Sequence, residues 1–305
     1  YSKDDGQTWH LAGILYPTDG TAYSYDYPFG ATGKDAAGTG TAFWVAIKVD
    51  ATISELILYE YKDDVELNVF HIPAGSDGNV RQLSRINVPG SKIGGYGNMD
   101  TSPVDGTAYV VGAGACGADV DPLDSTNVLG DVCSPETGTC PSIGGLVYVS
   151  KCTPPPNVVC GMSTIVARTD FATPAPNAQA VRSTLTMPSV AVDKNDVVYI
   201  LYPDLAPQGP TSIDQNNDVF GGINRQATLL YLIKSNDKGK TWSTPRIIND
   251  DTYYPDDPSQ DATKFRQLLR YDPVTHALAI IWTDTRDDMS GAAVTTRRYG
   301  AVIPL

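Results

Sequence analysis

Short runs of apolar residues, each bounded by polar turn residues, recur along most of the chain. Residues 190–204 contain an apolar, β-branched run, a polar turn, and a second apolar run that ends in an acidic residue. Residues 269–284 repeat this order, and residues 100–111 form a third copy. Short β-branched and aromatic runs between Asp, Asn, Gly and Pro predict β-strands rather than helices. Each copy therefore predicts two strands joined by a short turn.

A third apolar run follows each strand pair, and in two copies a fourth run comes after it. The predicted third strands are residues 146–151 and 229–234 and, as degenerate copies, residues 56–61 and 293–298. The predicted fourth strands are residues 163–166 and 244–248. Four antiparallel strands that pair in chain order form the blade of a β-propeller.

The repeat divides the chain into four units, which cover residues 17–90, 91–175, 180–250 and 262–305. It predicts an all-β protein with a single domain, residues 1–305, built as a β-propeller of four-stranded antiparallel blades.

Two copies of one eight-residue pattern, Ser-x-Asp-x-Gly-x-Thr-Trp, occur at residues 2–9 and 235–242. The pattern suits a tight hairpin, because the Asp carboxylate can accept turn amides and Gly can adopt a backbone conformation that a Cβ opposes. The Ser and Thr hydroxyls can bond local backbone groups, and the Trp can pack beneath the turn. The residues with this structural role are Ser2, Asp4, Gly6, Thr8, Trp9, Ser235, Asp237, Gly239, Thr241 and Trp242.

This pattern resembles the Asp-box, or BNR repeat, of the sialidase-like β-propellers. The resemblance implies a secreted or surface protein that recognises or processes glycans on the face opposite the Asp-boxes. Rings of this family usually have six or seven blades, which favours a chain that is part of a longer protein. The alternative is that residues 9–16 complete the last blade and close the ring. The arginine motif of sialidases would precede the first Asp-box, and residues 265–268 are no substitute because they lie in another blade.

Strand parity predicts which face carries the function. In an antiparallel blade, the 1–2 and 3–4 turns share one face, and the 2–3 and 4–1 connections share the other. The Asp-boxes are 3–4 turns. The long irregular segments all belong to the opposite face, and they are residues 112–145, 170–184, 204–227 and 249–263. Long loops on a rigid scaffold are where binding and catalysis concentrate.

Trp282, Asp284 and Arg286 are two positions apart at the end of one second strand, so they project from the same side. An aromatic ring can stack on a sugar, a carboxylate can supply acid/base chemistry, and Arg can hold a substrate carboxylate with two bonds. The alternative is structural: Asp284 and Arg286 form a salt bridge between blades, and Trp282 belongs to the core.

Other residues extend this candidate site. Tyr202 and Asp204 occupy the equivalent place in the preceding blade, and Arg297 and Arg298 lie near the end of the last predicted third strand. The candidate catalytic residues are Asp284 and Asp204, and the candidate substrate-binding residues are Trp282, Arg286, Tyr202, Arg297 and Arg298.

The charge balance narrows the choice of partners. The chain has 22 basic and 35 acidic residues, which gives a formal net charge of −13. Such a surface repels nucleic acid and anionic lipid, so neither is an expected partner, and it suits a secreted protein or one that binds cations. A glycan or polysaccharide partner is what the resemblance to the sialidase-like propellers implies. No apolar stretch approaches the about 20 residues that a membrane-spanning helix needs.

All five cysteines fall between residues 116 and 160, which favours disulfides and an oxidising extracellular compartment. A zinc site is the alternative, but no His lies nearby and no CxxC pair occurs. Cys152 and Cys160 flank a proline-rich turn where a third Asp-box would stand, and we predict that they form a disulfide. The odd number leaves one thiol unpaired or bonded to another chain, which allows self-association.

Acidic residues in the predicted long loops offer oxygen ligands of the kind that Ca²⁺ prefers. The candidate sets are Asp119, Asp121 and Asp124, and Asp214, Asn216 and Asp218. Solvated acidic turns are the alternative, and no cofactor other than Ca²⁺ is expected. Two functional hypotheses remain: a sialidase-like exo-glycosidase, and a non-catalytic carbohydrate-binding or structural extracellular propeller.

Overall fold

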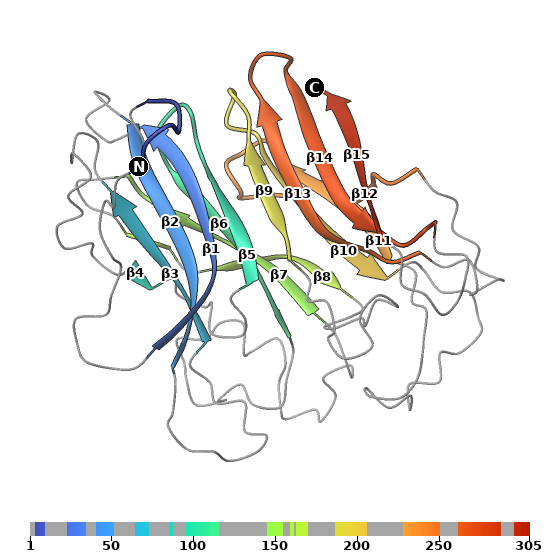
Figure 1. Cartoon of the computed structure of the whole chain (residues 1–305), viewed down its shortest axis with the longest axis horizontal. Helices are drawn as coiled ribbons and strands as arrows, with labels where there is room; N and C mark the ends of the chain where they lie inside the picture. The colour runs from blue at the N-terminus through green and yellow to red at the C-terminus, as the bar shows by residue number, and fades with distance from the viewer. Residues whose placement is uncertain are drawn as a thin grey trace.

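The computed structural model describes the following residues: 4–9, 23–34, 41–51, 65–72, 86–87, 96–115, 145–154, 159–161, 163–169, 187–205, 228–250, 262–287 and 296–305. Within these ranges the chain forms fifteen β-strands and no α-helix (Figure 1). The strands assemble into four antiparallel sheets, A to D, in which neighbours in sequence are neighbours in space.

The strands of each sheet follow one another along the chain. Sheet A contains β1 (Tyr23–Lys34), β2 (Thr41–Ala51), β3 (Val65–Ile72) and β4 (Ile86–Asn87). Sheet B contains β5 (Tyr96–Thr101), β6 (Ala108–Ala115), β7 (Gly145–Cys152) and β8 (Thr164–Thr169). Sheet C contains β9 (Ser189–Val192), β10 (Val198–Leu205), β11 (Thr228–Ser235) and β12 (Arg246–Ile247). Sheet D contains β13 (Lys264–Asp272), β14 (Ala277–Asp284) and β15 (Arg297–Pro304).

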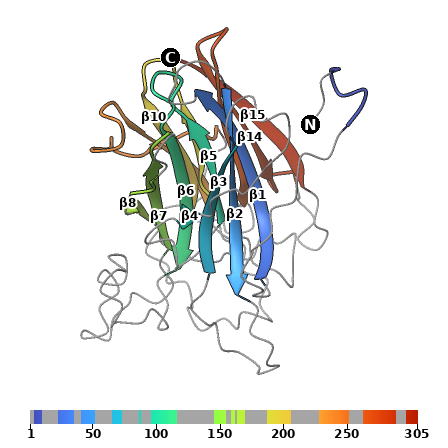
Figure 2. The same cartoon turned by 90° about the vertical axis from the view of Figure 1, so that its left-hand side faces the viewer.

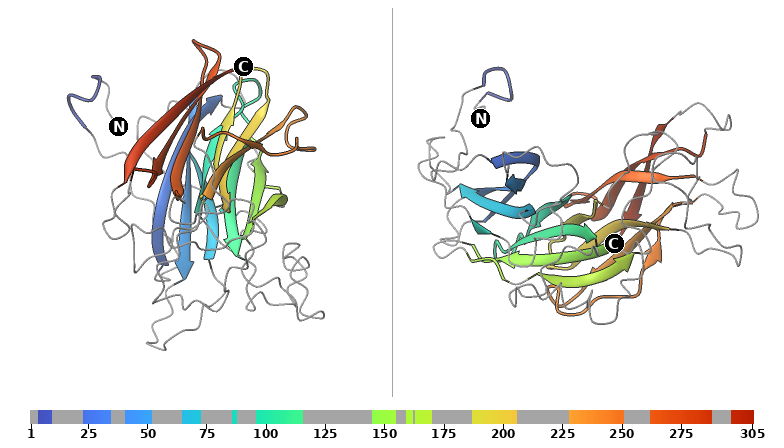
Figure 3. Two further views of the ribbon diagram at one scale, coloured as in Figure 1. Left: turned by 90° about the vertical axis from the view of Figure 1, so that its right-hand side faces the viewer. Right: turned by 90° about the horizontal axis from the view of Figure 1, so that it is seen from below.

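The four sheets confirm the four units predicted from the repeat, because each sheet falls within one predicted range and has the predicted meander order. The first strands β1, β5, β9 and β13 lie next to one another in that order, so the sheets form a consecutive array (Figure 3). The described strands do not close this array into a ring, and sheets A and D form its two ends.

Three apolar layers join the sheets, which stand face to face (Figure 2). The A–B layer includes Trp44, Ala46, Met99 and Val110; the B–C layer includes Val111, Val149, Ile200 and Tyr202; the C–D layer includes Tyr199, Leu201, Leu278, Ile280 and Trp282. Successive residues of β10 enter opposite layers, as the two-residue period of a strand requires. Sheets B and C therefore bury apolar side chains on both faces.

The second Asp-box adopts the predicted hairpin between β11 and β12. The Asp237 carboxylate accepts hydrogen bonds from the Thr241 amide at 2.9 Å and the Thr241 hydroxyl at 2.6 Å. Ser235 Oγ accepts the Gly239 amide, and Gly239 has a φ of +81°, a conformation that favours glycine. Trp242 packs, half-buried, against the B–C layer. Sequence and structure agree at this turn.

The first Asp-box has the same local bonds but a different environment. Asp4 accepts the amide and the hydroxyl of Thr8, and Gly6 has a φ of +84°. Trp9 folds back onto its own turn, as predicted, and its Nε1 donates to the Gly6 carbonyl at 3.1 Å, but its side chain is 76% exposed. The hairpin stands apart from the sheets (Figure 2), so none of the three apolar layers covers the indole ring of Trp9. Ser2 lies outside the described residues.

A charged cluster confirms that the second Asp-box shares a face with the 1–2 turns. Lys238, in the Asp-box, lies 2.7 Å from the Asp105 carboxylate and 3.0 Å from the Asp196 carboxylate. Asp105 belongs to the β5–β6 turn and Asp196 to the β9–β10 turn. Hydrogen bonds to the two carboxylates raise the pKa of Lys238, which is the expected effect of stabilising its charged form.

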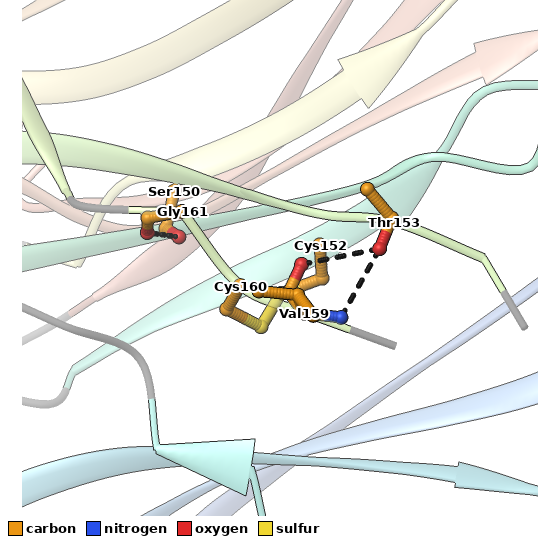
Figure 4. The surroundings of a disulfide bond; sticks show 6 residues. All are labelled: Ser150, Cys152, Thr153, Val159, Cys160 and Gly161. Atoms are coloured by element: carbon orange, nitrogen blue, oxygen red, sulfur yellow. Dashed lines mark hydrogen bonds between the residues drawn. A yellow bond between two sulfur atoms is a disulfide. The ribbon is translucent and has the colours of Figure 1, made fainter. Parts of the chain in front are cut away.

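The predicted Cys152–Cys160 disulfide is present at the end of β7 (Figure 4). The two cysteines also pair as an isolated antiparallel bridge, and the Thr153 and Val159 backbones are hydrogen-bonded beside them. The disulfide therefore closes the 3–4 hairpin of sheet B at the place where sheet C has an Asp-box. Cys116, Cys133 and Cys140 lie outside the described residues.

Two predicted third strands are wrong in position. In sheet A the third strand is Val65–Ile72 instead of residues 56–61, which lie outside the described residues. In sheet D it is Arg297–Pro304, several residues beyond the predicted 293–298. Both regions contain two neighbouring apolar runs, and the pairing with the second strand decides which run joins the sheet.

The predicted Ca²⁺ ligands, Asp119, Asp121, Asp124, Asp214, Asn216 and Asp218, lie outside the described residues, and that site stays a prediction. Among the residues that are described, no three His, Cys, Asp or Glu side chains form a group that could hold a metal ion. The same part of the chain has no helix that is long and apolar enough to cross a membrane.

Candidate functional site

The end of β14 carries the three residues that the sequence pattern singled out. The Asp284 carboxylate accepts hydrogen bonds from Trp282 Nε1 at 2.9 Å and from Arg286 Nε at 2.8 Å. Its second oxygen accepts the Arg286 amide at 2.9 Å. The three side chains therefore lie on one side of the strand, as their spacing predicts.

Arg286 connects this end of sheet D to sheet C. Its guanidinium lies 2.7 Å from Asp284 and 2.9 Å from Asp250, which follows β12. The hydrogen bond from Arg286 lowers the pKa of Asp250, so this carboxylate stays ionised. The guanidinium carbon also lies 4.2 Å from the centre of the Tyr299 ring, within the range of a cation–π contact.

The third strand completes the cluster from the other side. Tyr299 pairs in register with Trp282, and the two rings stack with their centres 6.1 Å apart. The Tyr299 hydroxyl donates a hydrogen bond of 2.5 Å to Asp287, and this bond raises the pKa of the tyrosine. Arg297 lies 3.3 Å from the same carboxylate. We refer to Trp282, Asp284, Arg286, Asp287, Arg297, Tyr299 and Asp250 as the sheet D cluster.

Burial separates this cluster into an anchor and a solvent-facing part. Trp282 is 2% exposed, and the side chain of Asp284 is fully buried with both oxygens hydrogen-bonded. The side chains of Arg297 and Asp250 are 67% and 85% exposed. Asp284 is therefore arranged to position Arg286, while the outer residues can meet a ligand. The buried Trp282 and the Asp284–Arg286 ion pair agree with the structural alternative given in the sequence analysis. The ion pair that joins the two sheets, however, is formed by Arg286 and Asp250.

The strand β13 adds residues that the sequence analysis did not assign. Lys264 pairs in register with Asp284. Its side chain is buried, and its ammonium donates a hydrogen bond to the Ala262 carbonyl at 3.1 Å. A β-bulge between Phe265 and Leu268 places Arg266 and Gln267 opposite Trp282. Two successive polar residues between apolar ones break the strand alternation, and this signal could have indicated the bulge.

Within the part of the chain that the structure describes, this end of sheet D carries more positive than negative side chains. The cationic residues are Lys264, Arg266, Arg286, Arg297 and Arg298, and the anionic residues are Asp250, Asp284 and Asp287. Arg298 is exposed, but it pairs with Thr283 and so belongs to the opposite face of the sheet from Arg297. Among the described residues of this end, five are cationic and three are anionic, on a chain with a net charge of −13, and this balance favours an anionic ligand.

Tyr202 and Asp204 lie in a different layer of the molecule. Tyr202 is 3% exposed, stacks on Tyr231 with centres 5.9 Å apart, and belongs to the B–C layer. Burial raises the pKa of Tyr202 further above its usual range. Asp204 is half-buried and follows Tyr202 on the same side of β10. The structure therefore does not bring Asp204 together with Asp284, which faces the C–D layer.

No family model matches the chain, and no curated protein matches its sequence. Among solved structures, it is similar to a protein of unknown function from Dyadobacter fermentans DSM 18053, with a TM-score of 0.47 and 12% identity over 90% of this chain and 68% of the other. An α-L-arabinofuranosidase from Fusarium graminearum gives a TM-score of 0.48 and 13% identity over 90% of this chain and 61% of the other. A Bacillus subtilis levansucrase gives a TM-score of 0.46 and 11% identity over 97% of this chain and 71% of the other. Similarity at this level carries no argument about what this chain does.

Proposed function

We propose that the protein binds a carbohydrate at the long-loop end of sheet D, and that the ligand carries an acidic group. The observation that carries this proposal is the guanidinium of Arg286, which is held by Asp284 and Asp250 against the ring of Tyr299. A sugar is recognised by fixed polar groups beside an aromatic ring, and this arrangement matches the fixed Arg286 beside the half-buried ring of Tyr299.

The exposed residues of the sheet D cluster supply the ligand contacts in this proposal. Arg297 can donate to a ligand carboxylate, because its contact with Asp287 leaves most of its side chain in solvent. Asp250 and Asp287 can accept hydrogen bonds from sugar hydroxyls. The buried Asp284 has a positioning role, since its oxygens already accept bonds from Trp282 and Arg286.

A glycan array followed by titration calorimetry tests this proposal. We expect binding to glycans that contain a sugar acid, and a loss of at least about tenfold in affinity for Arg297→Ala, which corresponds to one charge-assisted contact. Lys240→Ala is the matched control, because Lys240 is an exposed cation on the Asp-box face. Equal losses for both variants, or no glycan binding by the native protein, would contradict the proposal.

A second candidate function is hydrolysis by an exo-glycosidase of the sialidase-like kind, and the Tyr299–Asp287 pair favours it. A tyrosine can act as the nucleophile of a glycosidase when a carboxylate accepts its proton, and the Tyr299 hydroxyl already donates to Asp287. This candidate predicts turnover of a fluorogenic sialoside that Tyr299→Phe abolishes while glycan binding persists. If the protein binds glycans but shows no turnover, hydrolysis is ruled out and glycan binding remains as the proposed function.

A secreted or cell-surface location forms part of the same proposal. The Cys152–Cys160 disulfide supports it, because disulfides persist in oxidising compartments.

A further inference from the structure

Lysine side chains cross the junctions between neighbouring sheets at the Asp-box face. Lys34, at the end of β1, donates to the Val104 carbonyl in the β5–β6 turn at 3.4 Å and joins sheet A to sheet B. The ion pairs of Lys238 join sheet C to sheet B. Lys194, in the β9–β10 turn, lies 3.1 Å from Nε2 of His276 in the β13–β14 turn and joins sheet C to sheet D. Each of the three junctions between the described sheets therefore has a lysine contact at this face.

The partner of the lysine at the C–D junction differs from the others in its chemistry. A backbone carbonyl accepts hydrogen bonds at any pH, and carboxylates such as those of Asp105 and Asp196 are ionised above pH about 4. An imidazole takes up a proton near pH 6.5 and then has no acceptor left. Of these three lysine contacts, only the one between Lys194 and His276 can therefore be broken by a change between about pH 8 and pH 5.

Two contacts assign the proton on the neutral ring of His276. The ammonium of Lys194 can only donate, so Nε2 must be the unprotonated nitrogen. Nδ1 then carries the proton and donates it to the Tyr271 hydroxyl at 2.9 Å, and the two rings stack with centres 6.4 Å apart. The backbone of His276 has a φ of +53°, which is uncommon for a residue other than glycine. The turn therefore holds this ring at the junction between the sheets.

Two charged groups act on His276 in opposite directions. The ammonium of Lys194 repels a protonated ring at this distance, whereas the carboxylate of Asp272, in the ring's own turn, attracts it. The pKa of Asp272 is lowered mainly by the hydrogen bond from Thr275 and in smaller part by the charge of His276, so the two groups interact. Protonation therefore favours Asp272 over Lys194 as the partner of the ring.

The other titratable groups beside this contact do not change over the same pH range. On sheet C, the Asp193 carboxylate accepts the amides of Asn195 and Val197 and the hydroxyl of Tyr199. The phenols of Tyr199 and Tyr271 stay protonated below pH about 9. The protonation of His276 alone therefore decides between the two arrangements.

We propose that His276 makes the contact between sheets C and D dependent on pH. At neutral pH its ring accepts the Lys194 ammonium across the junction. Below about pH 6 the imidazolium leaves Lys194 and pairs with Asp272 within its own turn, which weakens the junction at the Asp-box face. The Arg286–Asp250 ion pair, which joins the same two sheets at the long-loop end, keeps both charges over this range.

Nitrogen-15 NMR of the histidine rings tests the proton assignment. The variant His276→Asn identifies the signals of His276, and it suits the turn because Asn also tolerates a positive φ. In the native protein at pH 8, we expect the proton on Nδ1 and none on Nε2. A proton on Nε2 under these conditions overturns the proposal, because that nitrogen could not accept a hydrogen bond from Lys194.

Hydrogen–deuterium exchange, corrected for the intrinsic effect of pH, tests the weakening of the junction. Between pH 8 and pH 5.5, exchange in residues 193–197 and 272–276 of the native protein should rise at least about twofold. Lys194→Met and His276→Asn should exchange faster already at pH 8, with no further rise at pH 5.5. Residues 102–107, which the Lys238–Asp105 pair holds, are the control and should not respond to pH. Native protein without this rise, or a rise that persists in both variants, overturns the proposal.

Discussion

Removal of the Asp284 carboxylate is expected to destabilise the fold strongly. The carboxylate is fully buried and accepts hydrogen bonds from Trp282 Nε1, the Arg286 amide and the Arg286 guanidinium. In Asp284→Ala, the guanidinium of Arg286 loses its buried counter-ion, and the Trp282 N–H loses its acceptor. Breaking a buried pair by removing one partner costs about 3–5 kcal/mol. Arg286 is 18% exposed and can recover some hydration, so we expect about 3 kcal/mol.

Asp250→Ala removes the other carboxylate that contacts Arg286 and provides the comparison. Because the Asp250 side chain is 85% exposed, its loss should cost no more than about 1 kcal/mol. Urea unfolding followed by tryptophan fluorescence measures both variants and Arg286→Ala. The double variant Asp284→Ala/Arg286→Ala should cost clearly less than the sum of the two single changes, because the groups share one contact. If Asp284→Ala destabilises no more than Asp250→Ala, the anchoring role assigned to Asp284 is refuted.

Three other predictions concern the scaffold. Gly112→Ala places a Cβ against the ring of the fully buried Tyr148, so it should lower the free energy of unfolding by about 1–3 kcal/mol. Gly161→Ala is the control: the nearest contact of its Cβ would be 3.7 Å away, so it should be nearly neutral in the same unfolding assay. Under non-reducing conditions, Cys152→Ser/Cys160→Ser should lose about 2–3 kcal/mol in the same assay, and a loss below about 1 kcal/mol would contradict a stabilising role for this disulfide. Hydrogen bonds from Thr241 hold the pKa of Asp237 well below its usual range. The ionised carboxylate therefore stabilises the fold fully above pH about 4, and this contribution declines as the pH falls further. The melting temperatures of the native protein and of Asp237→Asn should approach each other below that pH, and a constant difference down to pH 3 would contradict this.

The repeat made most of the fold predictable. Strand, turn and Asp-box residues are local signals, so residues 190–204 and 235–242 specify their own conformations through turn chemistry and alternation. Local sequence did not decide whether residues 56–61 or residues 65–72 form the third strand of sheet A. Both runs are apolar and strand-like, and only the register with β2 distinguishes them.

The candidate site was predictable along one strand and unpredictable across strands. The spacing of Trp282, Asp284 and Arg286 places them on one side of β14, because that relation depends only on the period of a strand. The contacts of Arg286 with Asp250 and Tyr299 depend on how sheet C meets sheet D and on the position of β15. No spacing within the sequence encodes those two relations.

Trp9 shows why a motif alone does not fix an environment. Its hairpin has the same carboxylate and hydroxyl bonds as the hairpin of Trp242, and both contain a glycine at positive φ. Trp242 meets the B–C layer, whereas Trp9 lies apart from any sheet and stays exposed. Burial of an Asp-box tryptophan is therefore a property of the neighbouring sheets.

Hydrogen–deuterium exchange, with and without the tightest glycan from the array, tests the central claim most directly. The account predicts slower exchange on glycan binding in residues 284–287 and 297–299, and unchanged exchange in the Asp-box residues 235–242. Protection confined to the Asp-box face, or absent from the end of sheet D at a saturating glycan concentration, would contradict the assignment of the binding site.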